Sequence, residues 1–211
     1  SEFSYRQNMP LVSDAVSVLP AGLAGNVPGA ISTASVPGNY DTPGARGSTM
    51  HGLVNATFVL PRTPLFDTAS VAGELTWMHL ANVTQNEAAY KGRSSYSGID
   101  KPTPTYWGLG LSITPTWYQV FPGIDLTMPV TWNQGISGNA ATSFGGNKGT
   151  GSWSIGMGAT IFQTYLLNLS YIGYFGSYST AAATGAATVF NGSSAAISDR
   201  GWVSLTFKST F

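Results

Sequence analysis

Residues 201–211 read GWVSLTFKSTF, and their side chains alternate between apolar and polar types. Val203, Leu205, Phe207 and Phe211 fall on one face of an extended chain, whereas Lys208 and several Ser and Thr residues fall on the other. Successive side chains of a β-strand point to opposite sides, so a period of two is typical of a strand with one apolar face. The sequence therefore predicts a strand over these residues.

The same alternation recurs along the rest of the chain and predicts about eight strands in total. The polar positions carry mostly Gly, Ser, Thr and Asn rather than charged residues or a second apolar set. The further predicted strands are Phe3–Asn8, Val54–Leu60, Val71–Trp77, Trp107–Ile113, Ile124–Trp132, Trp153–Ile161 and Leu167–Phe175. We expect an all-β fold with an antiparallel sheet.

The composition is unusual for a protein surrounded by water. Charged residues make up 9% of the 211 residues, against about 25% in an average soluble domain. No apolar run approaches the length of a membrane-spanning helix, about 20 residues, and the mean hydropathy is +0.07. A barrel that turns an apolar face to lipid and a small polar face to its lumen has these properties. We therefore expect residues 1–211 to form one antiparallel transmembrane β-barrel unit.

The connections between the predicted strands alternate in length, which is typical of outer-membrane barrels. The short connections are Pro61–Phe66, Val120–Gly123 and Gln163–Tyr165. The long ones are Met9–Gly47, Asn82–Thr103, Gly135–Gly149 and Gly176–Ser198, and they hold most of the charged residues. We expect the long loops to lie outside the cell, with Met9–Gly47 folding over or into the mouth of the barrel.

Aromatic residues cluster near the ends of the predicted strands. Such residues form belts at the two membrane interfaces of barrel proteins, although some of them could instead fill the lumen or pack under loops. The set comprises Trp77, Tyr106, Trp107, Trp117, Tyr118, Trp132, Trp153, Tyr165 and Trp202.

The C-terminal strand resembles the assembly signal of bacterial outer-membrane proteins, which ends in a terminal Phe. Phe211, Phe207, Leu205 and Val203 match that pattern, whereas Ser209 stands where an aromatic or apolar residue is usual. The resemblance implies that outer-membrane lipid and lipopolysaccharide surround the protein and that the barrel-assembly machinery recognises this strand.

Three segments resemble the C-terminal portion of a family called domain of unknown function 1302. They are FSYRQNMPLV (residues 3–12), GELTW (73–77) and the strand Tyr171–Tyr174 leading into Phe175 and Gly176. The likeness extends over essentially the whole chain. It implies a location in the bacterial outer membrane and a role in moving small, often apolar or aromatic, compounds across it. It also implies a periplasmic or efflux-pump partner, and further strands that precede these residues in a longer protein.

Eight strands close a barrel whose interior is just filled by side chains. The polar faces here are too small and too weakly charged to fill such an interior. We therefore expect a slice of a wider barrel.

Four charged residues fall on the polar face and are candidates for lining the lumen: Glu74, Asp125, Lys208 and Arg6. Glu74 lies in the middle of a strand, where it could line a conduit or hold a gate together with Lys208 or Arg6. The alternative is a purely structural ion pair between neighbouring strands. Asp125 invites the same two interpretations, and it adjoins a turn.

The sequence offers little for other functions. The formal net charge is zero, so there is no basic field of the kind that binds nucleic acid. There is no cysteine, and the two histidines, His51 and His79, lack carboxylates at ligand spacing. His51 with Asn55 could serve a lipase-like site, but we expect no catalysis, no metal and no cofactor. The main hypothesis is a transport barrel, and the alternative is a barrel that anchors or docks an envelope partner without transport.

Overall fold

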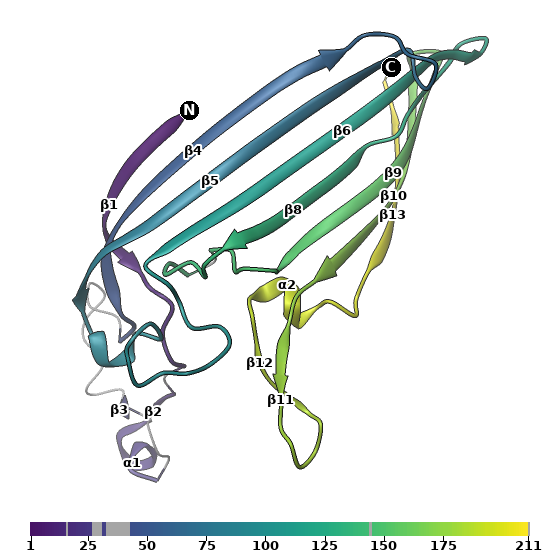
Figure 1. The fold of residues 1–211 in the computed structure, drawn as a ribbon. Helices are drawn as coiled ribbons and strands as arrows, with labels where there is room; N and C mark the ends of the chain where they lie inside the picture. The colour runs from purple at the N-terminus through teal and green to yellow at the C-terminus, as the bar shows by residue number, and fades with distance from the viewer. Residues whose placement is uncertain (16, 27–30, 33–42, 144, 211) are drawn as a thin grey trace.

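The computed structural model describes residues 1–15, 17–26, 31–32, 43–143 and 145–210, and Figure 1 shows their fold. One large sheet dominates the structure, and every pairing within it is antiparallel. Its strands are β1 (Glu2–Pro10), β4 (Arg46–Leu60), β5 (Thr68–Gln85), β6 (Thr105–Phe121), β7 (Ile124–Thr127), β8 (Val130–Ser137), β9 (Gly151–Ile161), β10 (Tyr165–Phe175) and β13 (Trp202–Ser209). The predicted all-β, antiparallel fold is confirmed.

The strands follow the order β1-β4-β5-β6-β7-β9-β10-β13, so neighbours in the sheet are successive strands of the chain. β7 and β8 both lie between β6 and β9 and are two halves of one interrupted strand. The sequence predicted a continuous strand over Ile124–Trp132, and the interruption falls at Met128 and Pro129. Proline has no backbone N–H to donate to a ladder, which accounts for a break at this position.

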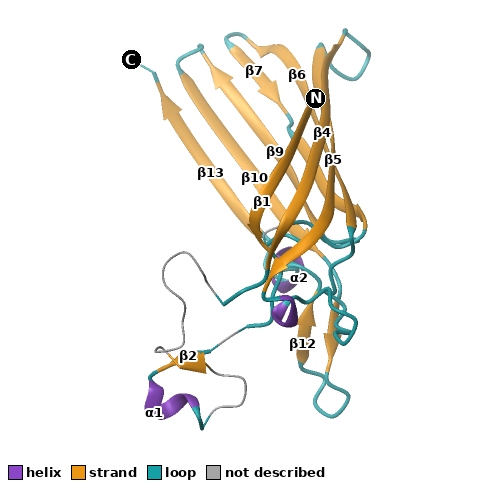
Figure 2. Cartoon of the chain, turned by 90° about the vertical axis from the view of Figure 1, so that its left-hand side faces the viewer, coloured by secondary structure: helices purple, strands orange, loops and turns teal. Residues whose placement is uncertain are grey.

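The sheet curls into a partial ring, and Figure 2 looks into its open side, between β1 and β13. These two strands are the edges of the sheet in the part of the chain that the structure describes. Their free edges leave the ring open, as expected for part of a barrel wall. No helix among the described residues is long and apolar enough to cross a membrane.

The connections lie at two distinct ends of the sheet (Figure 1). Residues 61–67, 122–123 and 162–164 make short turns at one end. Long loops lie at the other end, and their described residues are 11–15, 17–26, 31–32, 43–45, 86–104, 138–143, 145–150 and 176–201. The loops contain the small elements β2 (Val18–Leu19), α1 (Ala21–Ala24), β3 (Ile31–Ser32), the 3-10 helix Glu87–Ala89, β11 (Tyr178–Thr180), β12 (Ala187–Phe190) and α2 (Ser193–Ala196).

The register of the strands sorts the side chains onto two chemically different faces. Leu75 lies between Val54 and Leu109 on the convex face. On the concave face, Glu74 lies between Asn55 and Gly110. The same division continues to the far wall, where the outward Leu169 pairs with Met157 and Leu205. The alternating residues of neighbouring strands are therefore in register, so that the sheet has one apolar outer face and one polar inner face.

The buried core of the described residues lies under the long loops rather than between layers of sheet. It consists of Leu11, Ala45, Met78, Tyr90, Ala140 and Ala141, with Leu80, Val83 and Tyr106 packed against it. Two backbone hydrogen bonds fix it: Leu11 N–H donates to Ala45 O (2.9 Å), and Val12 N–H donates to Ala141 O (2.8 Å). The start of the predicted Met9–Gly47 loop thus packs at the mouth of the partial ring.

Candidate functional site

The concave face and the loops packed over one end of it form the candidate functional site. Two cavities lie where the loops meet this face. The first, here called the Arg6 pocket, has a volume of about 320 Å³, and the second, here called the Glu74 pocket, about 300 Å³. Thr76, Tyr106 and Gly145 line both, so the two cavities adjoin.

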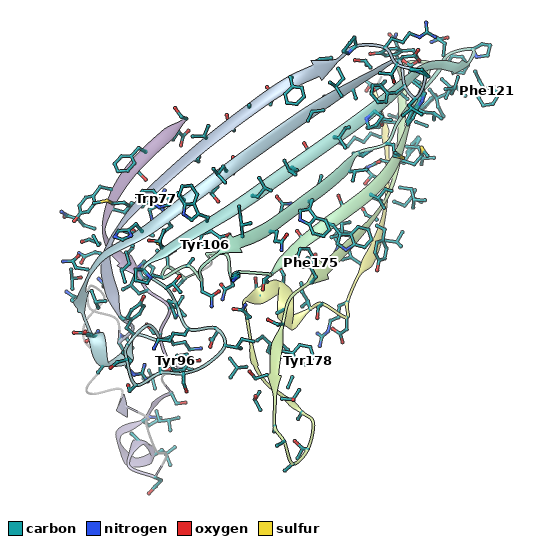
Figure 3. The ribbon with its side chains drawn as sticks, viewed as in Figure 1. Trp77, Tyr96, Tyr106, Phe121, Phe175 and Tyr178 are labelled. Carbon is teal, nitrogen blue, oxygen red and sulfur yellow. The ribbon has the colours of Figure 1, made fainter. Side chains whose placement is uncertain are left out.

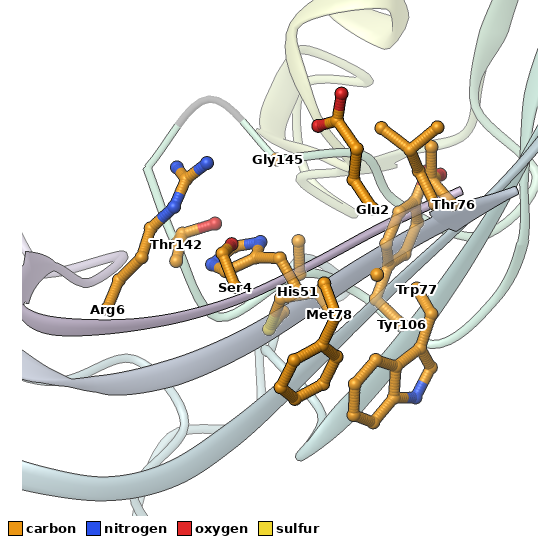
Figure 4. Close-up of a pocket in the computed structure, with 14 residues that line it drawn as sticks. Glu2, Ser4, Arg6, His51, Thr76, Trp77, Met78, Tyr106, Thr142 and Gly145 are labelled. Carbon is orange, nitrogen blue, oxygen red and sulfur yellow. The ribbon is translucent and has the colours of Figure 1, made fainter.

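The Arg6 pocket is built by β1, β4, β5, β6 and the loop after β8 (Figure 4). Glu2, Ser4 and Arg6 are alternate residues of β1 and therefore share its concave face. Their cross-strand partners on β4 are Leu53, His51 and Thr49. Trp77 lies on the other side of the strands in Figure 4, away from Glu2 and Arg6.

The loop side of the pocket is held by the core beneath it. Thr142 forms a β-bridge with Leu11, and Val12 N–H donates to Ala141 O. Ala140 and Thr142 are both buried and form part of the pocket lining. The pocket thus combines a loop anchored far along the chain with the edge strand of the sheet.

The two histidines lie on opposite faces of the sheet and do not form a catalytic arrangement. His51 is on the concave face, where its Nε2 lies 2.9 Å from the Thr49 hydroxyl. His79 pairs with the outward Met50, and its Nδ1 lies 2.9 Å from the Thr105 hydroxyl. The lipase-like pairing of His51 with Asn55 is therefore not formed. No group of three or more potential metal ligands occurs among the residues that the structure describes.

Glu74 lies in the middle of the concave face and lines the Glu74 pocket with Asn133, Thr150 and residues of α2. The predicted ion pairs of Glu74 with Lys208 or Arg6 are not formed: the described ion pairs are Arg62–Asp67, Lys91–Asp100, Arg93–Asp14 and Arg200–Asp199. The prediction fails because Arg6 and Lys208 lie on the two edge strands, β1 and β13, and Glu74 on β5 between them.

Asp125 lies at the short-turn end, away from both pockets. It accepts a hydrogen bond from Gln119 N–H (2.8 Å), and Gln119, whose φ is 50°, in turn accepts one from Gly123 N–H (3.0 Å). Asp125 therefore shapes the turn between β6 and β7. The four predicted charged residues share the concave face but fall at four different places on it.

A network of asparagines and threonines clamps the loops beside the Glu74 pocket, and sequence reasoning missed it. Asn191 is 5% exposed; its side chain accepts from Asn147 Nδ2 (2.8 Å) and donates to Lys148 O (2.9 Å). The Thr150 hydroxyl donates to Asn191 O (2.6 Å). Buried amides of this kind stabilise only when their hydrogen bonds are satisfied. No periodic signal in the sequence marks them.

The long loop after β5 carries a second cluster, made of ionic and aromatic groups. Lys91 Nζ lies 2.6 Å from Asp100 Oδ2, and the Tyr96 hydroxyl donates to the same carboxylate. Burial opposes the charge on Asp100, but the hydrogen bonds from Lys91 and Tyr96 outweigh it and lower its pKa. Burial raises the pKa of Tyr90, in the core next to this loop, to about 12. None of the cluster residues Lys91, Tyr96 and Asp100 lines either pocket.

The residues of the predicted assembly signal lie on the convex face of β13. Val203, Leu205 and Phe207 are 64%, 69% and 64% exposed. Phe211 lies outside the described residues. Of the predicted aromatic belt, Tyr106 and Trp202 lie on the concave face: Tyr106 joins the loop core, and Trp202 Nε1 donates to the Tyr174 hydroxyl (3.1 Å).

The fold and its two-faced sheet can now be set beside known proteins. Comparison with curated proteins and with solved structures gives no match. The family described as "Protein of unknown function (DUF1302)" matches residues 1–211, so the chain belongs to that family.

Proposed function

We propose that this sheet is part of the wall of a bacterial outer-membrane β-barrel that passes small apolar or aromatic compounds across the membrane. The observation that carries the proposal is the exposed apolar face of the sheet. Val54 is 60% exposed and Leu169 49% exposed, and both lie on the convex side. An apolar surface that runs across a whole sheet is unfavourable in water, because each Å² left exposed forgoes about 25 cal/mol of burial. Contact with lipid removes that cost.

Aromatic rings at both ends of the convex face support the membrane part of the proposal. Towards the long loops, the rings of Trp77 and Trp107 lie 6.3 Å apart, and those of Trp132 and Phe175 lie 4.8 Å apart. At the short turns, Tyr165 and Phe207 stack at 6.0 Å. Trp and Tyr prefer the boundary between hydrocarbon and water. Two aromatic zones separated by aliphatic residues match the thickness pattern of a membrane barrel.

The concave face supports the transport part of the proposal. Its strand centres carry small polar residues, with Glu74 and the Asn133 amide facing the interior. At the loop end of the concave face, strand and loop residues together line two adjoining cavities of about 320 and 300 Å³. Pockets of that size suit small molecules. A barrel that only anchors or docks a partner would not need such pockets.

The proposal also places the partners. Lipid and lipopolysaccharide would contact the convex face, and the barrel-assembly machinery would bind β13. A periplasmic or efflux-pump protein would approach the short turns. In the alternative, without transport, docking of such a partner is the whole function.

Flux measurements on the protein in liposomes test the proposal. We expect uptake of a small aromatic solute, and we expect Asn133→Trp to reduce it several-fold because the new side chain fills the Glu74 pocket. The matched control is Leu111→Trp, which adds the same ring to the convex face of the adjacent strand. Absence of solute flux and of conductance in planar bilayers would contradict transport and favour the anchoring role.

A further inference from the structure

Arg6 is a cation without a counter-ion on a face that holds few charges. Arg62, Lys91, Arg93 and Arg200 each have a carboxylate within 4 Å in the described part of the chain, and Arg6 has none. Its guanidinium projects from the concave face of β1 at one end of the Arg6 pocket (Figure 4). A guanidinium presents a planar fork of donors that matches a carboxylate in two parallel hydrogen bonds.

Two hydroxyls accompany the guanidinium. Ser4 is the neighbouring concave residue of β1, and Thr142 faces the same cavity from the loop. Thr142 is 6% exposed and lines the same pocket. An anion in the pocket can accept hydrogen bonds from the Thr142 hydroxyl and the Arg6 guanidinium together.

The rest of the pocket is suited to an apolar body. Met78 is 3% exposed, and with Tyr106 and Ala140 it forms the apolar part of the lining. At the other end of the pocket stands Glu2, whose carboxylate faces the same cavity (Figure 4). A second negative charge on the ligand would meet Glu2 and be repelled.

We propose that the Arg6 pocket binds a small organic monocarboxylate, with the carboxylate at Arg6 and Thr142 and an aromatic or aliphatic body along Met78 and Tyr106. The volume of about 320 Å³ is at the lower end of the range for ligand pockets. The ligand is therefore about the size of one substituted ring. This inference rests on the proposed function and names the chemical class of solute that the barrel selects.

The test is calorimetric binding of three probes to the full chain in detergent: benzoate, its neutral isostere benzamide, and the dianion terephthalate. We expect benzoate to bind at least about tenfold more tightly than benzamide, because hydrogen bonds to a charged partner contribute that much or more. Arg6→Gln should abolish the preference, and Arg6→Lys should retain part of it because the charge remains without the fork. Terephthalate should bind more weakly than benzoate and gain affinity in Glu2→Gln.

The matched control is Arg200→Gln, which removes one positive charge from a loop site 73% exposed and outside both pockets. It should leave the ratio of benzoate to benzamide affinity unchanged. Circular dichroism checks that each variant keeps its β-structure. Equal binding of benzoate and benzamide, an unchanged ratio in Arg6→Gln, or no measurable benzoate binding overturns the inference.

Flux in liposomes separates this inference from the proposed function. Passage of benzamide with no preference for the anion would support transport and would contradict the monocarboxylate site. Binding of benzoate that depends on Arg6, without any flux, would support the monocarboxylate site and would contradict transport.

Discussion

At the scale of single residues, Gly138 enables the loop after β8 to pass close to β6. Its φ is +70°, and a Cβ at this position would collide with the carbonyl oxygen of Thr105. Gly149 has nearly the same φ, +71°, but a Cβ there would meet nothing within 4 Å. Replacing Gly149 by alanine therefore tests the energetic cost of the positive φ alone, whereas replacing Gly138 by alanine adds the cost of the steric clash with Thr105.

We predict that Gly149→Ala lowers the free energy of unfolding by about 1–2 kcal/mol, the cost of a left-handed conformation for a residue with a Cβ. Gly138→Ala should lower it by more than that, because the new methyl group also displaces Thr105. Urea unfolding of both variants measures the difference. Equal losses would mean that the loop moves freely away from β6.

The Lys91–Asp100 pair makes the loop cluster sensitive to pH at both extremes. The pKa of Asp100 is lowered from its ordinary 3.8, so its contribution is present above pH 3.8 and is lost as the pH falls through the lowered value. For Lys91, burial acts to lower the pKa, but the hydrogen bond and attraction of Asp100 outweigh it and raise the pKa above 10.5. That contribution is present below pH 10.5 and is lost as the pH rises through the raised value.

We therefore predict that hydrogen exchange in residues 86–104 is slowest between about pH 4 and pH 10, the window bounded by the ordinary pKa values of the pair. We compare exchange rates after correction for intrinsic exchange. The wild-type loop should lose protection as the pH falls below about 4, and Asp100→Asn should show no such acid transition. Arg62→Gln, in a turn at the opposite end of the sheet, is the control and should leave this loop unchanged. A wild-type profile that persists in Asp100→Asn would assign the acid transition to another group.

At the scale of elements, the period of two identified every strand of the large sheet but not every boundary. The sequence predicted β5 over Val71–Trp77, and it runs from Thr68 to Gln85. Beyond Trp77 the inward positions hold Met78, which belongs to the loop core, and Leu80, which packs against it, whereas the outward position holds His79, so the phase of the alternation reverses. The hairpin of β11 and β12 was not predicted either, because Ala and Thr dominate it and give no periodic signal.

The two faces of β10 provide a direct test of which side meets lipid. Leu169 points outward between Met157 and Leu205, and the next residue, Ser170, points inward between Gly156 and Ser204. We predict that Leu169→Arg destabilises the protein in bilayers by about 2–4 kcal/mol, the cost of Arg on the lipid face near the midplane. Ser170→Arg should be much milder, because its side chain enters the interior. Reversible unfolding from liposomes measures both losses of stability. A larger loss for Ser170→Arg than for Leu169→Arg would mean that the concave face, not the convex face, meets lipid.

At the scale of the whole molecule, the sequence predicted which face each charged residue occupies but not which residues meet. Arg6 and Glu74 are on the concave face as their strand positions required. Their surroundings come from Thr142 and Asn147, in a loop far along the chain. Contacts of that kind depend on how the long loops fold over the mouth, and loop packing has no repeat that a single sequence can reveal. Figure 3 shows Tyr106 on the sheet and Tyr96 and Tyr178 in those loops.

We propose that the convex face of the partial ring meets lipid and that the concave face meets water. The chain has no cysteine, so single cysteines can be placed on both walls and challenged in liposomes with a water-soluble maleimide. We predict that Ser170→Cys and Thr76→Cys react, whereas their neighbours Leu169→Cys and Leu75→Cys are protected. Equal reaction of all four cysteines, or reaction of the convex pair alone, would contradict it.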